Sequence, residues 1–340
     1  MSDPILVLSD GKPGHDSQTA GMVEALERVT GAPVERLDLR LRVKGLRVGL
    51  HAALAAAARL PPGRRGAAAR TALGFGYRLD RPWPRRAAAV VSTGGDTLYA
   101  NALLALATGA PNLFAGSLRG VWHGHFTRIV TNRSAGATRA LPNAIVLEVA
   151  PVAKRGGQER QPGPFTVAVL VGGDGSGYRF GREDWQALAA RLAEIDRTGA
   201  RILLTTSRRT GPVGEAILAE AAAGCAGLDR AVFYGRAPEP VMPDYLARAD
   251  AFVVTPESAS MVTEAVLTGR PVLLAGPPPK RPEPRHERFL AQLEQDRRIA
   301  RLAPGEGFLT PDMLASGFRP IEAHPVDELA AALAPLWRAP

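Results

Sequence analysis

Two serines and two glutamates stand close together in one short stretch, Thr255 to Glu264, and their spacing suits the binding of a nucleotide. The turn 256–260 separates an apolar run from a segment that is apolar on one side. The first N–H groups of a helix have no partner inside it and lie at the positive end of its dipole, so an anion is bound well there. Glu264, about two turns into this helix, would accept hydrogen bonds from ribose hydroxyls. The alternative is a helix start that the serines only cap.

A second candidate for binding phosphate is the loop 172–177, which holds four glycines in six residues. Such a loop lets backbone N–H groups approach a diphosphate closely. Ser207, Arg208 and Arg209 follow the next apolar run, and guanidinium groups neutralise a diphosphate well. The alternative is a simple flexible turn. The loop lacks both the GxGxxG fingerprint and the Lys-Ser/Thr ending of a P-loop, which argues against a nicotinamide dehydrogenase and a P-loop NTPase.

The first half of the chain carries a polar loop of a different kind, Asp10 to Ser17. His15 is a candidate general base, because an imidazole exchanges protons near neutral pH, and either Asp16 or Asp10 would orient it. The alternative is a tight turn with a helix cap. In the loop Thr93-Gly94-Gly95-Asp96, Asp96 either lines a cleft or caps the next helix.

His123 and His125 have the spacing of one strand face. No third ligand follows in a recognisable pattern, so we predict exposed or cleft-lining histidines and no metal site.

These loops need strands and helices to position them. The stretch 251–275 reads as strand, turn, helix and strand, which is a βαβ unit of a parallel sheet. Similar strand–loop–helix patterns recur in both halves, and ligands of such sheets bind beyond the carboxyl ends of the strands. We therefore predict an α/β protein with two doubly wound, Rossmann-like domains, 1–153 and 165–340, facing across a cleft. The polar stretch 154–164 reads as their linker.

The net charge of +9 is concentrated between Arg40 and Arg86, where twelve basic residues accompany one acid, Asp80. The segment is predicted to be helical and broken at Pro61-Pro62. Its mixture of basic and apolar residues suits an anionic membrane surface better than duplex nucleic acid. The alternative is an ordinary solvated arginine face. The start of the chain does not resemble a signal peptide, and no apolar run is long enough to span a bilayer. We expect a cytoplasmic protein, soluble or peripheral on the inner face of the cytoplasmic membrane.

Four motifs together resemble one family. They are the opening Ser9-Asp10-Gly11-Lys12-Pro13-Gly14-His15-Asp16-Ser17-Gln18, the turn Ser92–Gly95, the Gly172-Gly173 loop and the turn Thr255–Met261. They are similar to the elongated-mitochondria (mitochondrial fission) family, whose bacterial members have a GT-B-like appearance. The fission role belongs to plant members and is not carried over to a chain of bacterial composition. The family has a histidine–acid turn where this chain has Thr131-Asn132-Arg133-Ser134, without an acid.

The resemblance implies a GT-B glycosyltransferase that moves a sugar from a nucleotide-sugar to an acceptor hydroxyl, on a lipid or cell-envelope glycan, without a metal or cofactor. The helical turn 256–264 also resembles the nucleotide-sugar half of such enzymes. A non-catalytic membrane adaptor on the same fold and a nucleotide-sugar epimerase are the alternatives. The expected catalytic residues are His15, Asp16 and Asp96, and those at the acceptor are Asp10, Lys12, Gly94 and Gly95. The expected donor-binding residues are Gly172, Gly173, Asp174, Ser176, Ser207, Arg208, Arg209, Glu257, Ser258, Ser260, Met261 and Glu264.

Overall fold

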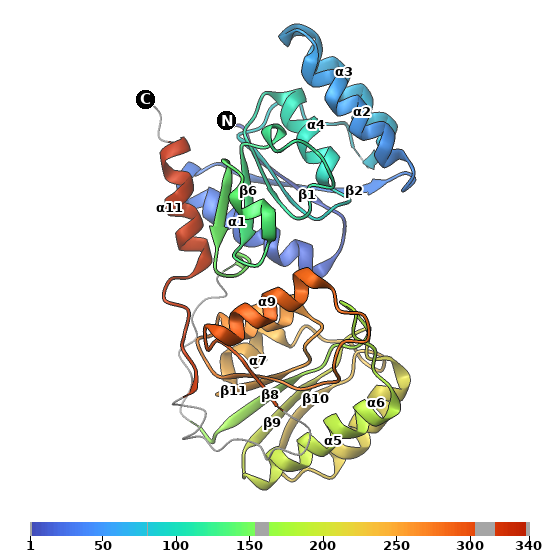
Figure 1. The fold of residues 1–340 in the computed structure, drawn as a ribbon, viewed down its shortest axis with the longest axis vertical. Coiled ribbons are helices and arrows are strands. Elements are labelled where there is room, and N and C mark those ends of the chain that lie inside the picture. Colours follow the sequence, from blue (N-terminus) through green and yellow to red (C-terminus); the bar gives the residue numbers. More distant parts are fainter. Residues whose placement is uncertain (1, 80, 154–162, 303–316, 338–340) are drawn as a thin grey trace. The chain divides into compact units, whose positions relative to one another are not determined.

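The chain forms two compact units, which we describe separately (Figure 1). The computed structural model describes residues 2–79, 81–153, 163–302 and 317–337. Unit 1 holds residues 1–154 and 323–340, and unit 2 holds residues 155–322.

Unit 1 is built on a seven-stranded sheet in the order β3-β2-β1-β4-β5-β6-β7. Neighbouring strands are parallel, except that β2 and β3 are antiparallel. The central strands are almost wholly apolar and buried, as expected for a parallel sheet covered on both faces. The strands are β1 (Ile5–Ser9), β2 (Val34–Leu41), β3 (Tyr77–Leu79), β4 (Ala89–Thr93), β5 (Asn112–Ala115), β6 (Arg128–Asn132) and β7 (Ala144–Leu147).

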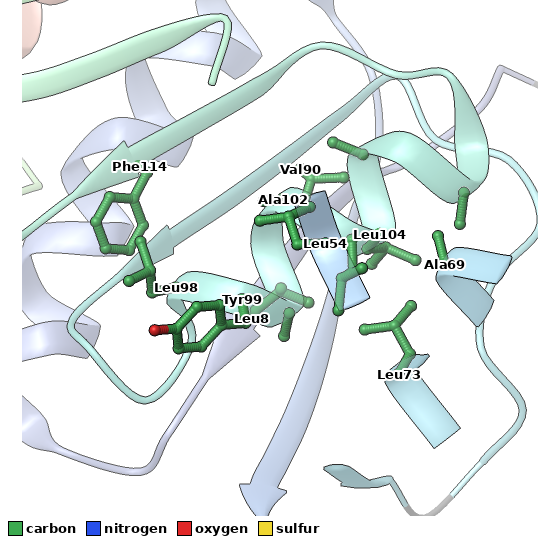
Figure 2. Close-up of a cluster of buried hydrophobic side chains, with 14 of the residues drawn as sticks. Leu8, Leu54, Ala69, Leu73, Val90, Leu98, Tyr99, Ala102, Leu104 and Phe114 are labelled. Carbon is green, nitrogen blue, oxygen red and sulfur yellow. The ribbon is translucent and has the colours of Figure 1, made fainter. Parts of the chain in front are cut away.

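Helices cover both faces of this sheet. On one face, α1 (Pro13–Thr30) and α11 (Pro325–Trp337) share a core with the strand residues Ile5 and Val7. On the other face, Leu6 and Leu8 pack against α2 (Leu46–Arg59), α3 (Pro62–Gly76) and α4 (Leu98–Thr108). Figure 2 shows this second core, with side chains from all three helices gathered over β1 and β4.

Unit 2 repeats the design with a six-stranded parallel sheet in the order β10-β9-β8-β11-β12-β13. Helices α5 and α6 pack on one face, and α7 and α9 lie on the other (Figure 1). The strands are β8 (Thr166–Leu170), β9 (Arg201–Thr205), β10 (Leu228–Val232), β11 (Ala251–Val254), β12 (Val272–Leu274) and β13 (Ala300–Arg301). The helices are α5 (Arg182–Arg197), α6 (Gly211–Ala223), α7 (Met242–Arg248), α8 (Ala259–Val266) and α9 (Pro284–Gln295).

The predicted fold class is confirmed, because both sheets have the strand order and helical layers of a doubly wound Rossmann-like domain. The end of the chain, which we assigned to the second domain 165–340, forms helix α11 and belongs to unit 1. Its apolar residues Val326, Leu329 and Leu333 are fully buried in the core that α1 forms on the sheet. Most of the predicted linker, residues 154–162, lies outside the described residues.

The polar loop 10–17 is shorter than predicted, because α1 already begins at Pro13. Proline is well suited to the first turn of a helix, and Asp16 is favourable there because of the helix dipole. None of the described helices is long and apolar enough to cross a membrane.

Candidate functional site

Both sheets reverse their strand order at a central pair of strands, β1 and β4 in unit 1 and β8 and β11 in unit 2. In open α/β sheets, ligands bind beyond the carboxyl ends of the strands at such a reversal. The loops that leave these four strands, together with the helices α1 and α8 that follow two of them, contain the predicted site residues except Ser207, Arg208 and Arg209, which follow β9.

In unit 2, the loops after β8 and β11 are joined by hydrogen bonds. The Gly172 N–H donates to Thr255 Oγ1 at 2.7 Å, and the Gly173 N–H donates to Glu257 Oε1 at 2.9 Å. The sequence predicted that Gly172 and Gly173 belong to a loop whose backbone N–H groups approach a diphosphate. In this structure the N–H groups of these two glycines have partners in the protein, and the diphosphate site at the loop stays a prediction.

Glu257 is the central residue of this site. Its side chain is 0% exposed, and Arg209 Nη2 lies 3.1 Å from its Oε1 atom. Its Oε2 atom has no hydrogen-bond partner among the described residues. Burial raises the pKa of this carboxyl, and the Gly173 N–H and the Arg209 charge oppose that rise.

The glycines of the loop are required by this packing. A Cβ atom on Gly172 would overlap Glu257 Oε1, and one on Gly175 would overlap the guanidinium of Arg209. Because Gly172 and Gly175 have no side chain, the Arg209 side chain can lie directly against the backbone of the loop.

No side chain of the described residues caps the start of α8, where Ser258 and Ser260 lie. Ser258 is buried at the N-cap position, yet the described residues show no side-chain hydrogen bond that caps the helix. Its Oγ atom lies 3.5 Å from Ser260 Oγ. The capping alternative for these serines is thus not supported, whereas an anion site at the same place stays a prediction. Met261 and Glu264 follow on α8 and are both half-buried.

Other predicted residues surround this centre less closely. Asp174 accepts a hydrogen bond from the Phe180 N–H at 3.0 Å, and Ser207 Oγ accepts one from the Arg209 N–H at 3.2 Å. Arg208 is exposed, and Ser176 has a left-handed backbone with φ +45°.

Sequence reasoning missed the residues that hold the two loops from α9. His286 is buried, and its Nε2 atom lies 2.8 Å from the carbonyl oxygen of Pro256. Tyr178, at the end of the glycine loop, packs edge-on to the His286 ring and donates to Glu287 Oε1 at 2.8 Å. Burial raises the pKa of Tyr178 to about 12. No spacing signal pointed to His286, because its helix was not predicted.

In unit 1, a histidine and a carboxylate form a pair at the carboxyl end of β1. His15 Nδ1 lies 3.0 Å from Asp10, whose side chain is only 5% exposed. A Cβ atom on Gly94 would overlap the His15 ring, so the loop after β4 packs directly on the imidazole. Thr19, one turn further along α1, donates to the carbonyl oxygen of His15 at 2.8 Å.

The partner of His15 is Asp10 and not Asp16. Asp16 instead accepts hydrogen bonds from Ser9 Oγ at 2.6 Å and from Arg36 at 2.9 Å. The sequence left both carboxylates open as partners, and the structure distinguishes them because α1 turns the Asp16 side chain toward β2.

Asp96 completes the polar cluster. Lys12 Nζ lies 2.7 Å from both Asp10 and Asp96, and Arg47 from α2 also pairs with Asp96. The hydrogen bond from Lys12, together with Arg47, lowers the pKa of the Asp96 carboxyl. A carboxylate held this way is a weak base. Gly95 lies next to it, where a Cβ atom would overlap Arg119.

The pair His123 and His125 does not lie on a strand as its spacing had indicated. Both residues belong to a single 3-10 turn, η1 (His123–His125), and their rings flank the exposed Trp122. Among the described residues, no three His, Cys, Asp or Glu side chains are arranged to hold a metal ion.

Comparison with known proteins gives a family and a fold. Residues 13–334 match the sequence profile of the family described as Mitochondrial fission ELM1. A 118-residue stretch is 34% identical to the mitochondrial fission protein ELM1 of Arabidopsis thaliana. That stretch covers 34% of this chain and only 26% of the plant protein.

Solved structures of glycosyltransferases are similar over nearly the whole chain. The UDP complex of Arabidopsis thaliana UGT89C1 matches with a TM-score of 0.50 at 16% identity, covering 99% of this chain and 90% of that one. The UDP complex of a UGT transferase from Siraitia grosvenorii matches with a TM-score of 0.50 at 13% identity, covering 98% and 94%. MurG of Acinetobacter baumannii matches with a TM-score of 0.47 at 14% identity, covering 98% and 95%. At such low identity the two matches with a TM-score of 0.50 show a GT-B-like fold and nothing finer.

Proposed function

Since the chain belongs to the Mitochondrial fission ELM1 family and has a GT-B-like fold, we propose that it is a glycosyltransferase that uses a nucleotide-sugar donor. The observation that carries the proposal is the pairing of His15 with the buried Asp10 at the strand reversal of unit 1, where an open sheet binds its ligand. A purely structural turn has no need of an imidazole held by a buried carboxylate.

Unit 2 would bind the donor. The uncapped start of α8, with Ser258 and Ser260, offers N–H and hydroxyl donors to the diphosphate, and Arg208 and Arg209 offer positive charge. Glu264 would accept hydrogen bonds from the ribose. The UDP bound by two of the similar enzymes supports a nucleoside diphosphate as the ligand class.

Unit 1 would bind the acceptor and remove its proton. His15 Nε2 would take the proton of the acceptor hydroxyl, while Asp10 holds Nδ1 and stabilises the imidazolium that forms. The acceptor oxygen then bonds to the anomeric carbon, and the nucleoside diphosphate leaves with the electron pair of the broken bond. Asp16 and Asp96 are less suited to act as the base, because each is already held by cations. Lys12, Gly94 and Gly95 would contact the acceptor, and no metal or cofactor enters this scheme.

The acceptor is proposed to lie on a lipid or cell-envelope glycan, reached from the cytoplasmic face of the membrane. The support is the basic surface of α2 and α3, where the stretch 40–79 holds no acidic residue.

A non-catalytic adaptor is the second candidate, and the name of the family favours it. An adaptor needs neither the His15–Asp10 pair nor a nucleotide. An epimerase on this fold would convert a nucleotide-sugar without any acceptor, which separates it from a transferase in the same assay.

The donor site is tested by titration calorimetry with UDP, GDP and ADP. We expect Glu264→Ala to weaken binding of the preferred nucleotide by about 1–3 kcal/mol, roughly 5- to 150-fold, because a hydrogen-bonding group is lost. The matched control is Glu220→Ala, which removes an exposed glutamate on α6 of the same unit and should change nothing. Unchanged affinity in Glu264→Ala would remove the ribose role, and a parent protein that binds none of the three would favour the adaptor.

A further inference from the structure

The glycine loop of unit 2, residues 172–177, is covered by the side chain of Arg209. The guanidinium of Arg209 lies against Gly172 and Gly175, where it touches the positions that a Cβ atom would take. It also pairs with Glu257, although 36% of the Arg209 side chain stays exposed. An exposed arginine is free to change its rotamer, whereas Glu257 is fully enclosed.

The enclosed glutamate is left incompletely satisfied. Glu257 Oε1 accepts hydrogen bonds from the Gly173 N–H and from Arg209, while Oε2 has no hydrogen-bond partner among the described residues. A buried polar atom without a partner costs about 1–3 kcal/mol, and native chains rarely keep one without a reason.

A second buried glutamate on the same sheet edge shows the contrast. Glu215 Oε1 accepts hydrogen bonds from Thr206 Oγ1 at 2.7 Å and from the Gly235 N–H at 2.8 Å. Glu215 fastens the loops after β9 and β10, and neither of its oxygens is both buried and without a hydrogen-bond partner among the described residues. The orphaned oxygen is thus a property of Glu257 and not of every buried acid at this edge.

The charge of Glu257 decides which part of a ligand it can meet. A carboxylate repels phosphate oxygens and accepts hydrogen bonds from O–H and N–H groups. A phosphate would instead attract Arg209, because guanidinium–phosphate pairs form strong, bidentate hydrogen bonds. The two members of the ion pair therefore suit two neighbouring parts of one nucleotide-sugar.

We propose that the Arg209–Glu257 ion pair is a latch over the sugar position of the donor site, and that Glu257 is a specificity-determining residue for the sugar. The diphosphate draws Arg209 away, and the uncovered Glu257 carboxylate accepts a hydrogen bond from a sugar hydroxyl. This inference rests on the proposed function, since it assigns a role within the same donor site.

The test compares each nucleoside diphosphate with its sugar derivative. Calorimetry measures UDP, GDP, ADP and the glucose derivative of each against the parent protein and Glu257→Gln. The amide can still accept from the Gly173 N–H with its oxygen, but it replaces the Oε2 acceptor by a donor. We expect the affinity for the preferred diphosphate to stay within twofold or to rise, because Arg209 leaves a neutral group more easily. The affinity for its glucose derivative should fall roughly tenfold or more, on the scale of one buried hydrogen bond.

Two further variants separate the loss of a sugar contact from the loss of a phosphate contact and from the general effect of replacing a buried glutamate. Arg209→Gln should weaken the diphosphate and its glucose derivative by the same factor, because it removes a phosphate contact common to both. Glu215→Gln, the matched control, should leave the ratio of the two affinities at the parent value.

The inference is overturned if Glu257→Gln leaves that ratio unchanged or weakens both ligands equally, since Glu257 would then serve only the loop. A parent protein that binds none of the six ligands would overturn the proposed function itself, and the inference with it.

Discussion

At the scale of single residues, the central question is which group can accept a proton. His15 lies on the first turn of α1, fixed by Asp10 on one side and by the bare backbone of Gly94 on the other. Three constraints on one imidazole leave its Nε2 atom as the part that can meet a substrate. Such pre-organisation is what a general base requires.

We predict that His15→Ala lowers the turnover of sugar transfer by roughly 10²–10⁴, the usual contribution of a general base. Asp10→Asn should also lower turnover, because the amide no longer holds the correct tautomer or stabilises the imidazolium. Nucleotide affinity should be unchanged in both, since their site lies in unit 1. The measurement is initial rate against acceptor concentration, with calorimetry for the nucleotide.

The control for the carboxylate is Asp38→Asn, which alters an exposed aspartate paired with Arg36. It should keep the parent rate. Equal turnover in the parent and His15→Ala would exclude His15 as the base.

The sequence identified residues of the candidate site, but it did not show which of them hydrogen-bond to one another. The motif Asp10–Ser17 identified His15 as a candidate base, but spacing alone could not choose between Asp10 and Asp16. That choice depends on where α1 begins, since the first turn directs Asp16 to Ser9 and Arg36. Likewise, the glycine loop was recognisable, yet its N–H groups are used by Thr255 and Glu257, which only the paired strands bring near.

At the scale of elements, the helices α2 and α3 together carry five arginines and no acidic residue. Exposed residues on α2 and α3 include Val48 at 80% and Phe75 at 63%, together with Ala52, Ala56 and Ala67. Arg42, Lys44, Arg59, Arg64 and Arg78 are exposed around them. Arg47, Arg81 and Arg86, in contrast, are held in ion pairs with Asp96, Glu35 and Asp3.

This surface leads to a prediction about lipids. We expect the protein to cosediment at low salt with vesicles of phosphatidylglycerol and phosphatidylcholine, because each basic side chain near an anionic surface contributes about 1 kcal/mol. Binding should weaken as salt screens the charges. Val48→Glu and Phe75→Glu should each reduce binding severalfold, since they place an acid on the contacting face.

The matched control is Val213→Glu, because Val213 is also an exposed valine, at 50%, but on α6 of unit 2. It should cosediment like the parent. If the parent stays in the supernatant at low salt, the arginines form an ordinary solvated face.

Helices and strands whose apolar residues recur at regular spacing could be predicted from the sequence. Those that form only because of contacts with other parts of the fold could not. The break at Pro61-Pro62 correctly separated α2 from α3, because proline cannot continue a helix. Strand β3 is three residues long and antiparallel, too short for any period to show. Helix α9 begins at the last of five prolines within residues 277–284, a composition that is more typical of a loop than of a helix.

At the scale of the whole molecule, α11 shows that sequence order does not assign a helix to a unit. Its apolar residues recur with helical spacing at Val326, Leu329 and Leu333. That period predicts a buried face but not the partner that buries it. Proximity in sequence favoured unit 2, whereas the helix packs on α1 and β7 of unit 1.

We predict that Leu329→Ala destabilises unit 1 by about 2–5 kcal/mol, the range for truncating a buried leucine. Urea unfolding followed by the tryptophan fluorescence of Trp83 and Trp122, in a variant whose other tryptophans are phenylalanine, reports on unit 1. Leu336→Ala is the control on the same helix, because Leu336 is 39% exposed and should cost little. An equal effect of both substitutions would mean that α11 is not fastened by its buried face.

The return of α11 to unit 1 also has a consequence for biosynthesis. A ribosome that adds about 5–20 residues per second needs roughly 10–35 s to advance from residue 154 to residue 325. During that interval the core that Met22 and Leu26 share with α11 lacks the apolar side chains of that helix, while unit 2 is being made. Unit 1 therefore completes its fold only after nearly all of unit 2 has been synthesised, although its first strand is made first. The apolar surface that α11 later buries is then where a chaperone would hold the nascent chain.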